Sequence, residues 1–272
     1  IDPHTHKKIS TGSVESKFGI AIETGQAFSA ARAVLNLKNV TLCGFHCHIG
    51  SQIFESVPFA TALEIMLDFI KNVKEKLGFN TDMLNLGGGF GVRYTESDPK
   101  ISYTEKIREV ANSLNKQCAA LGLNTPKILT EPGRSLVADA GITLYTVGSV
   151  KEIAGYKNYV SVDGGMTDNP RYTLYESPYT VILASNAEKK CDFTADIAGR
   201  CCESGDLIGE GFKLPKPKRG DILAVLTTGA YNYSMASNYN RIARPPVVML
   251  NSERDYIAVK RESLSDICSL DV

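Results

Sequence analysis

Residues 83–91 read MLNLGGGFG, a short apolar run that stops at three consecutive glycines. An apolar run that ends so abruptly is typical of a buried strand followed by a turn. Two other stretches have the same form, VTLCGFHCHIGS at residues 40–51 and KILTEPGRS at residues 127–135. We therefore predict three strands, each of which ends in a polar or glycine-rich turn.

The segments next to these strands have helical periodicity. Apolar residues recur every three or four positions from Phe59 to Leu77 and from Ile107 to Leu121, and more weakly from Phe28 to Leu37. A glycine follows each of the first two segments, as is common where a helix ends. Strands that alternate with helices indicate a parallel α/β arrangement, in which ligand-binding groups lie at the carboxyl ends of the strands.

From about Ile142 the pattern changes to short extended runs with alternating apolar residues. These runs are ITLYTVGSV at 142–150, KNYVSVDGG at 157–165, GDILAVLTTGAY at 220–231 and PVVMLNSERDYIAVKR at 246–261. Such alternation, broken by turn residues, is typical of antiparallel strands. We therefore predict an α/β domain at residues 1–141, followed by an antiparallel β domain at residues 142–272.

The first twelve residues, IDPHTHKKISTG, have the composition of the polar end of a strand whose apolar body is absent from the sequence. A complete eight-stranded barrel takes roughly 250 residues, about twice the length that precedes the β region. The predicted fold is therefore α/β plus all-β: the C-terminal half of a TIM-type (β/α)8 barrel, without its N-terminal strands, followed by an antiparallel β domain.

The composition limits the kinds of partner. Lys plus Arg and Asp plus Glu are equal at 30 each, so no overall field attracts nucleic acid or an anionic membrane. No apolar run reaches the roughly 18 residues that span a bilayer, and no leader pattern opens the sequence. Seven scattered cysteines without a CxxC pair argue against a disulfide framework. We expect a cytoplasmic protein that acts on a small molecule, with neither nucleic acid nor membrane as partner.

Two histidines, His46 and His48, lie two positions apart at a predicted strand end, where side chains point to the same side. Zinc is one interpretation, with His4 and His6 earlier in the chain, but no further ligand is clearly offered beside the pair. The alternatives are a histidine packed under the sheet and a ring stacked on an aromatic cofactor. We favour no metal.

Two other turns contain charged or glycine residues that suit an anionic ligand. The triple glycine allows backbone N–H groups to approach a phosphate, or else serves packing alone. In TEPGRS, Glu131 and Arg134 could form an ion pair. Alternatively, Glu131 faces a ring-nitrogen cation and Arg134 a carboxylate or phosphate.

The β half adds Arg171, Tyr175, Tyr231 and the adjacent cysteines of CCESGD, residues 201–206. A disulfide between neighbouring cysteines is strained, so a free thiol is the better interpretation. The combination of these groups indicates pyridoxal phosphate chemistry on an amino acid. It includes a ring that can stack on the cofactor, glycines that can approach its phosphate and a carboxylate that can pair with its ring nitrogen. It also includes arginines that can bind a substrate carboxylate, and a thiol.

Seven motifs occur in an order that is characteristic of one family. They are THKKISTGSVESKFG, GFHCHIGSQI, NLGGGFG, TEPGRS, VDGGMTDNPRYTLY, CCESGD and GAYNYSMASNYN. The chain resembles the pyridoxal phosphate-dependent decarboxylases of ornithine, diaminopimelate and arginine, which have an alanine racemase-like fold. The resemblance implies a pyridoxal 5'-phosphate cofactor and a homodimer with shared active sites.

The resemblance also implies roles for individual residues. His48 is similar to the catalytic, cofactor-stacking histidine and Glu131 to the catalytic partner of the pyridine nitrogen. Cys202 is similar to a cysteine that donates a proton across the dimer interface, and Cys201 occupies a variable position. The expected cofactor contacts are His48, Ser51, Gly88, Gly89, Glu131, Gly133, Arg134 and Tyr231. The expected substrate contacts are Arg134, Arg171, Tyr175, Glu203 and Tyr231.

The activity implied by the resemblance is decarboxylation of meso-2,6-diaminopimelate to L-lysine and CO2, the last step of lysine biosynthesis. The alternatives are a decarboxylase of ornithine, lysine or arginine, a non-catalytic homologue, and a metal-dependent hydrolase that uses His46 and His48. The family's Schiff-base lysine lies in a Tyr-Ala-x-Lys type motif, which these 272 residues lack. We expect that lysine in an N-terminal part of the intact protein.

Overall fold

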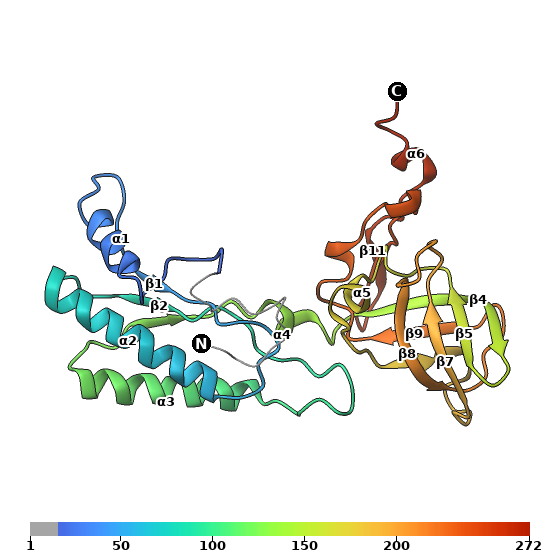
Figure 1. Ribbon diagram of the computed structural model, residues 1–272, viewed down its shortest axis with the longest axis horizontal. Helices are drawn as coiled ribbons and strands as arrows, with labels where there is room; N and C mark the ends of the chain where they lie inside the picture. Colours follow the sequence, from blue (N-terminus) through green and yellow to red (C-terminus); the bar gives the residue numbers. More distant parts are fainter. Residues whose placement is uncertain (1–15) are drawn as a thin grey trace. The chain divides into compact units, whose positions relative to one another are not determined.

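The computed structural model of the chain describes residues 16–272, and these residues form two units (Figure 1). The first unit contains Pro99–Ser135 and the described residues up to Val92. The second contains Leu136–Val272 together with the short segment Arg93–Asp98. Three features of the sequence analysis fall outside the described residues. The histidines at positions 4 and 6 and the expected strand end at residues 1–12 lie wholly outside them, and the motif THKKISTGSVESKFG lies largely outside them.

The first unit contains a parallel three-stranded sheet in the order β1–β2–β3. Its strands are β1 (Gly44–His46), β2 (Met83–Asn85) and β3 (Lys127–Leu129). Its helices are α1 (Gln26–Val34), α2 (Val57–Leu77) and α3 (Tyr103–Leu121), and α4 (Gly133–Val137) begins in it. Because α2 connects β1 to β2 and α3 connects β2 to β3, the predicted alternation of strands and helices is confirmed.

Helices α2 and α3 end where the sequence predicts, and both begin before the first residue of the predicted apolar pattern, α2 at Val57 and α3 at Tyr103. Pro58 lies in the first turn of α2, and Gly78 closes the helix in a left-handed conformation with φ 69°. The Ser102 hydroxyl caps α3 by accepting from the Glu105 N–H at 3.4 Å. Both helices lie along one face of the sheet (Figure 1), and their apolar residues pack with Leu84 and Leu86 in a common core.

The second unit contains a six-stranded sheet in the order β6–β9–β4–β5–β7–β8. Its strands are β4 (Ile142–Ile153), β5 (Lys157–Val162), β6 (Val181–Leu183), β7 (Phe193–Ala198), β8 (Leu207–Leu214) and β9 (Ile222–Leu226). All neighbouring pairs are antiparallel except β5 and β7, which are parallel. The antiparallel prediction is therefore wrong for this pair. A parallel pair needs a long connection, and residues 163–192 provide one.

The connection between β5 and β7 contains α5 (Arg171–Tyr175) and a 3-10 turn at Ala184–Asn186. The sequence pattern predicts no helix here, because five residues are too few for helical periodicity to show. The remaining elements are β10 (Val247–Leu250), β11 (Asp255–Val259), α6 (Leu264–Ile267) and 3-10 turns at Tyr233–Met235 and Tyr239–Arg241. None of the helices in residues 16–272 combines the length and the apolar character needed to span a bilayer.

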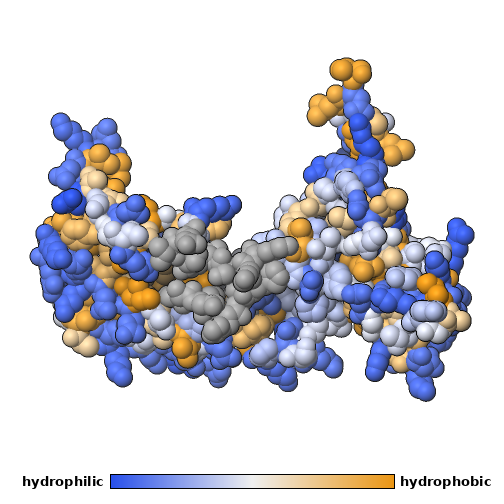
Figure 2. Space-filling model, viewed as in Figure 1, coloured by the Kyte–Doolittle hydropathy of each residue, from blue (hydrophilic) through white to orange (hydrophobic). Residues whose placement is uncertain are grey.

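The segment that carries β10, β11 and α6 has apolar side chains on its surface. Figure 2 shows apolar residues near the C-terminal end of the chain. The exposed members are Val248, Met249, Leu250, Ile257, Leu264 and Leu270. Apolar side chains that gather on one exposed segment are typical of surfaces that another chain covers.

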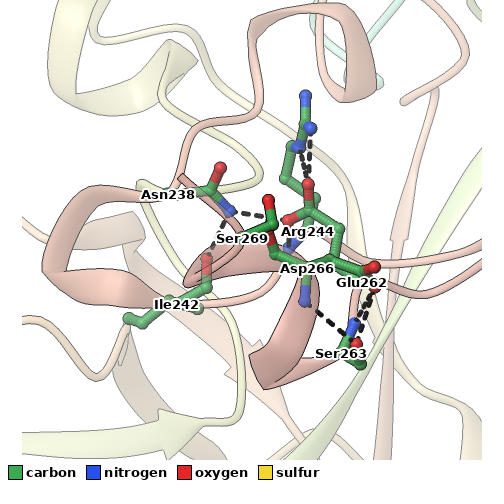
Figure 3. A network of polar contacts seen from close by, with 7 residues as sticks. All are labelled: Asn238, Ile242, Arg244, Glu262, Ser263, Asp266 and Ser269. Carbon is green, nitrogen blue, oxygen red and sulfur yellow. Dashed lines mark hydrogen bonds and ion pairs between the residues drawn. The ribbon is translucent and has the colours of Figure 1, made fainter. Parts of the chain in front are cut away.

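A polar network ties α6 to the loop before β10 (Figure 3). The Glu262 carboxylate accepts from the Arg244 backbone N–H at 2.8 Å, from Arg244 Nε at 2.7 Å and from Asn238 Nδ2 at 2.6 Å. Ser263 and Asp266 form a capping box at the start of α6. These contacts lower the pKa of Glu262 to about 2, chiefly through the Arg244 side chain.

We expect a Glu262→Gln substitution to reduce stability near neutral pH more than in acid. A lowered carboxyl pKa stabilises the folded state above the unfolded-state pKa near 4.5. That contribution is lost as the pH falls from there toward about 2. Thermal unfolding of the wild type and of Glu262→Gln should be measured across this pH range. The difference between their unfolding midpoints should become smaller as the pH falls. A difference that stays constant with pH would contradict this assignment.

Candidate active site

The carboxyl ends of β1, β2 and β3 lie at one edge of the parallel sheet, and hydrogen bonds join the turns that follow them. The Cys47 N–H donates to the Asn85 carbonyl at 2.9 Å, and the Leu86 N–H donates to the Leu129 carbonyl at 3.0 Å. The Glu131 N–H donates to the Gly87 carbonyl at 2.8 Å. The three turns that contain the first set of predicted site residues therefore form one continuous surface.

The glycines of MLNLGGGFG are required by the close approach of these turns. A Cβ on Gly88 would lie 2.1 Å from the Glu131 carbonyl oxygen. Gly89 has a φ of 91°, and a Cβ there would lie 2.3 Å from the Gly50 carbonyl oxygen. Packing alone therefore explains both glycines, and a phosphate contact at them stays a prediction. Gly133 differs, because a Cβ there would meet nothing within 4 Å.

We expect Gly88→Ala to destabilise the protein by about 1–3 kcal/mol or more, because a backbone oxygen cannot move aside as a side chain can. Gly133→Ala is the matched control and should change the free energy of unfolding by no more than about 0.5 kcal/mol. Chemical denaturation of the two variants measures both effects. Equal stability of the two variants would show that the turns are not packed as described.

Glu131 lies directly after β3, and its side chain is half exposed. Asn85 Nδ2 donates to Glu131 Oε1 at 2.9 Å, while Asn85 Oδ1 accepts from the Gly87 N–H at 2.8 Å. His46 Nε2 lies 3.8 Å from Glu131 Oε2. Asn85 thus fixes one carboxylate oxygen, and the exposed carboxylate retains the capacity to accept a hydrogen bond from a cationic ligand.

His48 follows β1 and lies beside Glu131. Its Nδ1 accepts from the Gly88 N–H at 3.3 Å, which places the proton of the neutral ring on Nε2. The pKa of His48 is below its ordinary value, first through desolvation and then through His46, with Glu131 acting in the opposite direction. Near neutral pH the ring is therefore uncharged.

Arg134 and Ser51 complete the predicted residues of the first unit. Arg134 is buried in α4, and its Nη2 donates to Ser51 Oγ at 2.9 Å. Glu131 and Arg134 therefore have different partners, Asn85 for the first and Ser51 for the second. This arrangement corresponds to the interpretation in which the two residues serve different groups.

The residues predicted in the second unit include a buried arginine among tyrosines. Arg171 is only 6% exposed, and its guanidinium carbon lies 5.6 Å from the Tyr175 ring centroid. The same carbon lies 5.7 Å from the ring centroids of Tyr231 and Tyr94. Within residues 16–272 no carboxylate forms an ion pair with Arg171, and its Nε has no hydrogen-bond partner. The faces of the tyrosine rings stabilise the positive charge of the Arg171 guanidinium, and an anionic ligand can pair with it.

The CCESGD loop contains an exposed free thiol beside a partly buried one. All seven cysteines lie in the described part of the chain and are free, and Cys202 is exposed. Burial, followed by the charge of Asp206, raises the pKa of the neighbouring Cys201 thiol to about 11. Glu203 is exposed and accepts a short hydrogen bond from the Tyr239 hydroxyl. Cys202 is therefore the more accessible of the two thiols.

Sequence reasoning missed several residues that support the site. Asn85 holds Glu131, Tyr94 packs against Arg171, Tyr239 holds Glu203, and Asp206 fixes the CCESGD loop. The only sequence signal for Asn85 is a polar residue at the end of an apolar strand. Tyr94 follows the glycine turn of the first unit but belongs to the second, which the sequence pattern does not reveal.

The residues of the first unit suit a pyridoxal ring. An exposed carboxylate suits a protonated ring nitrogen, and a neutral imidazole suits a ring face. The Ser51 hydroxyl and the Arg134 guanidinium can both donate hydrogen bonds to a phosphate. Within residues 16–272, no group of three or more His, Cys, Asp or Glu side chains is arranged to hold a metal ion.

Comparison with known proteins gives a family for the chain. The model of the pyridoxal-dependent decarboxylase, pyridoxal binding domain, matches residues 1–138, just over half of the 272 residues. Diaminopimelate decarboxylase from Bacillus subtilis (strain 168) is 46% identical over 272 residues, which are 100% of this chain and 62% of that protein.

Solved structures agree with this assignment. Diaminopimelate decarboxylase from M. jannaschii in complex with L-lysine superposes with a TM-score of 0.90 at 35% identity, over 100% of this chain and 61% of that one. Lysine/ornithine decarboxylase from Vibrio vulnificus, in complex with cadaverine, gives 0.69 at 25% identity, over 84% and 58%. The chain thus spans about three fifths of the length of these relatives. The resemblance seen in the seven motifs is confirmed, and the chain belongs to the pyridoxal-dependent decarboxylase family.

Proposed function

We propose that the full-length protein containing this chain converts meso-2,6-diaminopimelate to L-lysine and CO2 with pyridoxal 5'-phosphate. The relatives named diaminopimelate decarboxylase support the substrate, and the matched pyridoxal binding domain supports the cofactor. The observation that carries the proposal is the exposed Glu131 carboxylate, held by Asn85 beside the neutral His48 ring.

The first unit would bind the cofactor. Bound pyridoxal phosphate supplies a protonated pyridine ring that accepts the electron pair released when CO2 leaves the attached amino acid. Glu131 would keep the pyridine nitrogen protonated, because a nearby carboxylate favours the cationic form. His48 would lie against the ring face, in an orientation fixed by the Gly88 N–H. Ser51, Gly88, Gly89, Gly133 and Arg134 would hold the phosphate.

The second unit would bind the amino-acid substrate. Diaminopimelate has an amino-acid group at each end, so recognition of the far end needs a cation for its carboxylate and an acid for its ammonium group. Arg171 can provide the cation, because no described carboxylate neutralises it. Glu203 can provide the acid and is oriented by Tyr239. Tyr175 and Tyr231 line Arg171, and we assign both to the substrate side.

Cys202 would donate the proton that replaces the lost carboxylate. A thiol has an unperturbed pKa of about 8.5, so near neutral pH it carries a proton and can release it. Cys202 is exposed, whereas Cys201 is partly buried and its pKa is raised to about 11. The expected supply of Cys202 across a homodimer interface remains part of this proposal. The exposed apolar residues of the β10, β11 and α6 segment support an interface.

The architecture of the intact protein is also a proposal. The parallel β/α units of residues 16–135 would belong to a (β/α)8 barrel, supported by the agreement with decarboxylase structures of which the chain covers 61%. The Schiff-base lysine would come from a part of the protein outside these 272 residues. Seven free thiols are compatible with the reducing cytoplasm in which we expect the enzyme to act.

The test is release of CO2 by the full-length protein with pyridoxal phosphate from meso-diaminopimelate, ornithine, lysine and arginine in parallel. We expect the highest kcat/KM for diaminopimelate, with L-lysine as the product. Preference for another amino acid would assign the chain to a different specificity, as the likeness to a lysine/ornithine decarboxylase allows. Cofactor binding without turnover of any of the four would favour a non-catalytic homologue.

A further inference from the structure

Asp206 is a buried carboxylate that joins two loops of the second unit. Asp206 is only 3% exposed to solvent. Oδ1 accepts from the Met166 N–H at 2.6 Å, and Oδ2 accepts from the Cys201 N–H at 2.8 Å. Each carboxylate oxygen thus accepts from the backbone of a different loop, one within VDGGMTDNPRYTLY and the other within CCESGD.

Two glycines make room for this carboxylate. A Cβ on Gly165 would lie 2.4 Å from Asp206 Oδ1, and a Cβ on Gly199 would lie 2.2 Å from the same atom. Gly165 also has a φ of 145°, which side chains rarely allow. The two loops therefore approach each other closely only because neither has a side chain where the carboxylate lies.

The backbone of the CCESGD loop closes around Asp206. The Gly199 N–H donates to the Asp206 carbonyl at 2.8 Å, and the Asp206 N–H donates to the Glu203 carbonyl at 3.1 Å. Cys202 and Glu203 thus lie inside a short turn whose two ends are fixed by one residue. Hydrogen bonds from backbone N–H groups to an ionised carboxylate are stronger than neutral ones and hold the backbone directly.

The other loop leads directly to Arg171. Met166 lies five positions before Arg171, and the intervening turn is fixed from its other side by Asp168. Asp168 Oδ1 accepts from the Gly165 N–H at 3.0 Å, and Asp168 Oδ2 accepts a short hydrogen bond from the buried Tyr145 hydroxyl. The turn before α5 is therefore held between two carboxylates.

We propose that Asp206 is a positioning residue, which clamps the CCESGD loop to the turn before α5 and so sets the placement of Cys202 and Glu203 relative to Arg171. This inference rests on the proposed function, since the clamped residues are those assigned to proton donation and substrate recognition. The motifs alone do not indicate this role, in which a carboxylate that does not contact the substrate is needed for turnover.

The test is a double-mutant cycle with Asp206→Asn and Cys202→Ala in the full-length holoenzyme. An asparagine has one acceptor oxygen, and its amide NH2 would face a backbone N–H in place of the other. We expect Asp206→Asn to lower kcat by about 10- to 100-fold, the size of effect that small misplacements of reacting groups produce. In the Cys202→Ala background the further loss in kcat should be less than about 3-fold, since there is no thiol left to position, and the misplacement of Glu203 should then appear as a higher KM.

Asp221→Asn is the matched control. Asp221 is also buried in the second unit, and its Oδ2 accepts from the Lys218 N–H at 2.9 Å, in a turn outside the seven motifs. We expect this variant to keep kcat within about 2-fold of the wild type, as expected for an aspartate that serves only a local turn. The proposal is overturned if Asp206→Asn leaves kcat unchanged, if its cost is the same with and without Cys202, or if Asp221→Asn costs as much.

Amide hydrogen exchange separates this proposal from the proposed function, because it needs no activity. In Asp206→Asn at least one of the Met166 and Cys201 amides should exchange at least about 10-fold faster than in the wild type, because asparagine retains an acceptor oxygen for only one of them. The Lys218 amide should be unchanged. If the wild type does not decarboxylate diaminopimelate but one or both of these amides respond, the proposed function fails and the clamp stands. If neither amide responds, the clamp is wrong whatever the activity.

Discussion

Glu131→Gln in the full-length, cofactor-loaded protein is expected to lower kcat for decarboxylation by about 10²- to 10³-fold, the usual cost of removing one group that stabilises developing charge. Glutamine has nearly the shape of glutamate and can still accept from Asn85 Nδ2, so the Asn85 contact need not change. What is lost is the negative charge. Without it the pyridine nitrogen loses the partner that favours its protonated form.

The measurement for this prediction is steady-state turnover, with bound cofactor quantified by its visible absorbance. We expect the variant to retain the cofactor, because Ser51, Arg134 and the glycine turns are untouched. Glu64→Gln is the matched control, an exposed glutamate on α2 of the same unit, and it should behave as the wild type. Full activity of Glu131→Gln, or an equal loss in Glu64→Gln, would remove Glu131 from the mechanism.

Cys202→Ala is expected to lower kcat by about 10²- to 10⁴-fold, the range that a positioned proton donor contributes. Alanine removes the only atom of the side chain that carries a transferable proton. Because Cys202 is exposed, the substitution should leave the free energy of unfolding nearly unchanged. A loss of turnover without a loss of stability would therefore show that the Cys202 thiol takes part in the decarboxylation reaction.

The neighbouring cysteine provides the control. Cys201→Ala changes the same loop by the same atoms, but the pKa of Cys201 is raised to about 11 by burial and by Asp206, so it is the poorer proton donor near neutral pH. Its backbone N–H, which donates to Asp206, is retained in alanine. We expect only a few-fold change in kcat, in line with a residue that packs locally. The opposite order, with Cys201 essential and Cys202 dispensable, would reverse the assignment.

The parts of the fold that follow from local pattern could be predicted from the sequence. Helices α2 and α3 have long apolar stripes and clear glycine ends, so both were predicted close to their observed bounds. Strand β2 was predicted because its apolar run stops at the glycines. By contrast, the parallel pairing of β5 with β7 depends on a long connection, and α5 is too short for a periodic signal.

The same division applies to the site. Glu131 and His48 could be predicted because each follows a predicted strand, and parallel strands bring their carboxyl ends to one edge. Asp206 could not, although it stands in a quoted motif, because an aspartate after Ser-Gly is also an ordinary turn residue. Its role depends on the approach of Gly165 and Gly199, which are 34 positions apart and meet only in the fold.

A crystal structure of the full-length protein with bound pyridoxal phosphate would show whether Glu131 binds the ring nitrogen. We predict that a Glu131 carboxylate oxygen lies within hydrogen-bond distance of the pyridine nitrogen, about 2.6–3.2 Å. We also predict that the His48 ring lies against the face of the cofactor. A cofactor bound with its ring nitrogen remote from Glu131 would contradict the account.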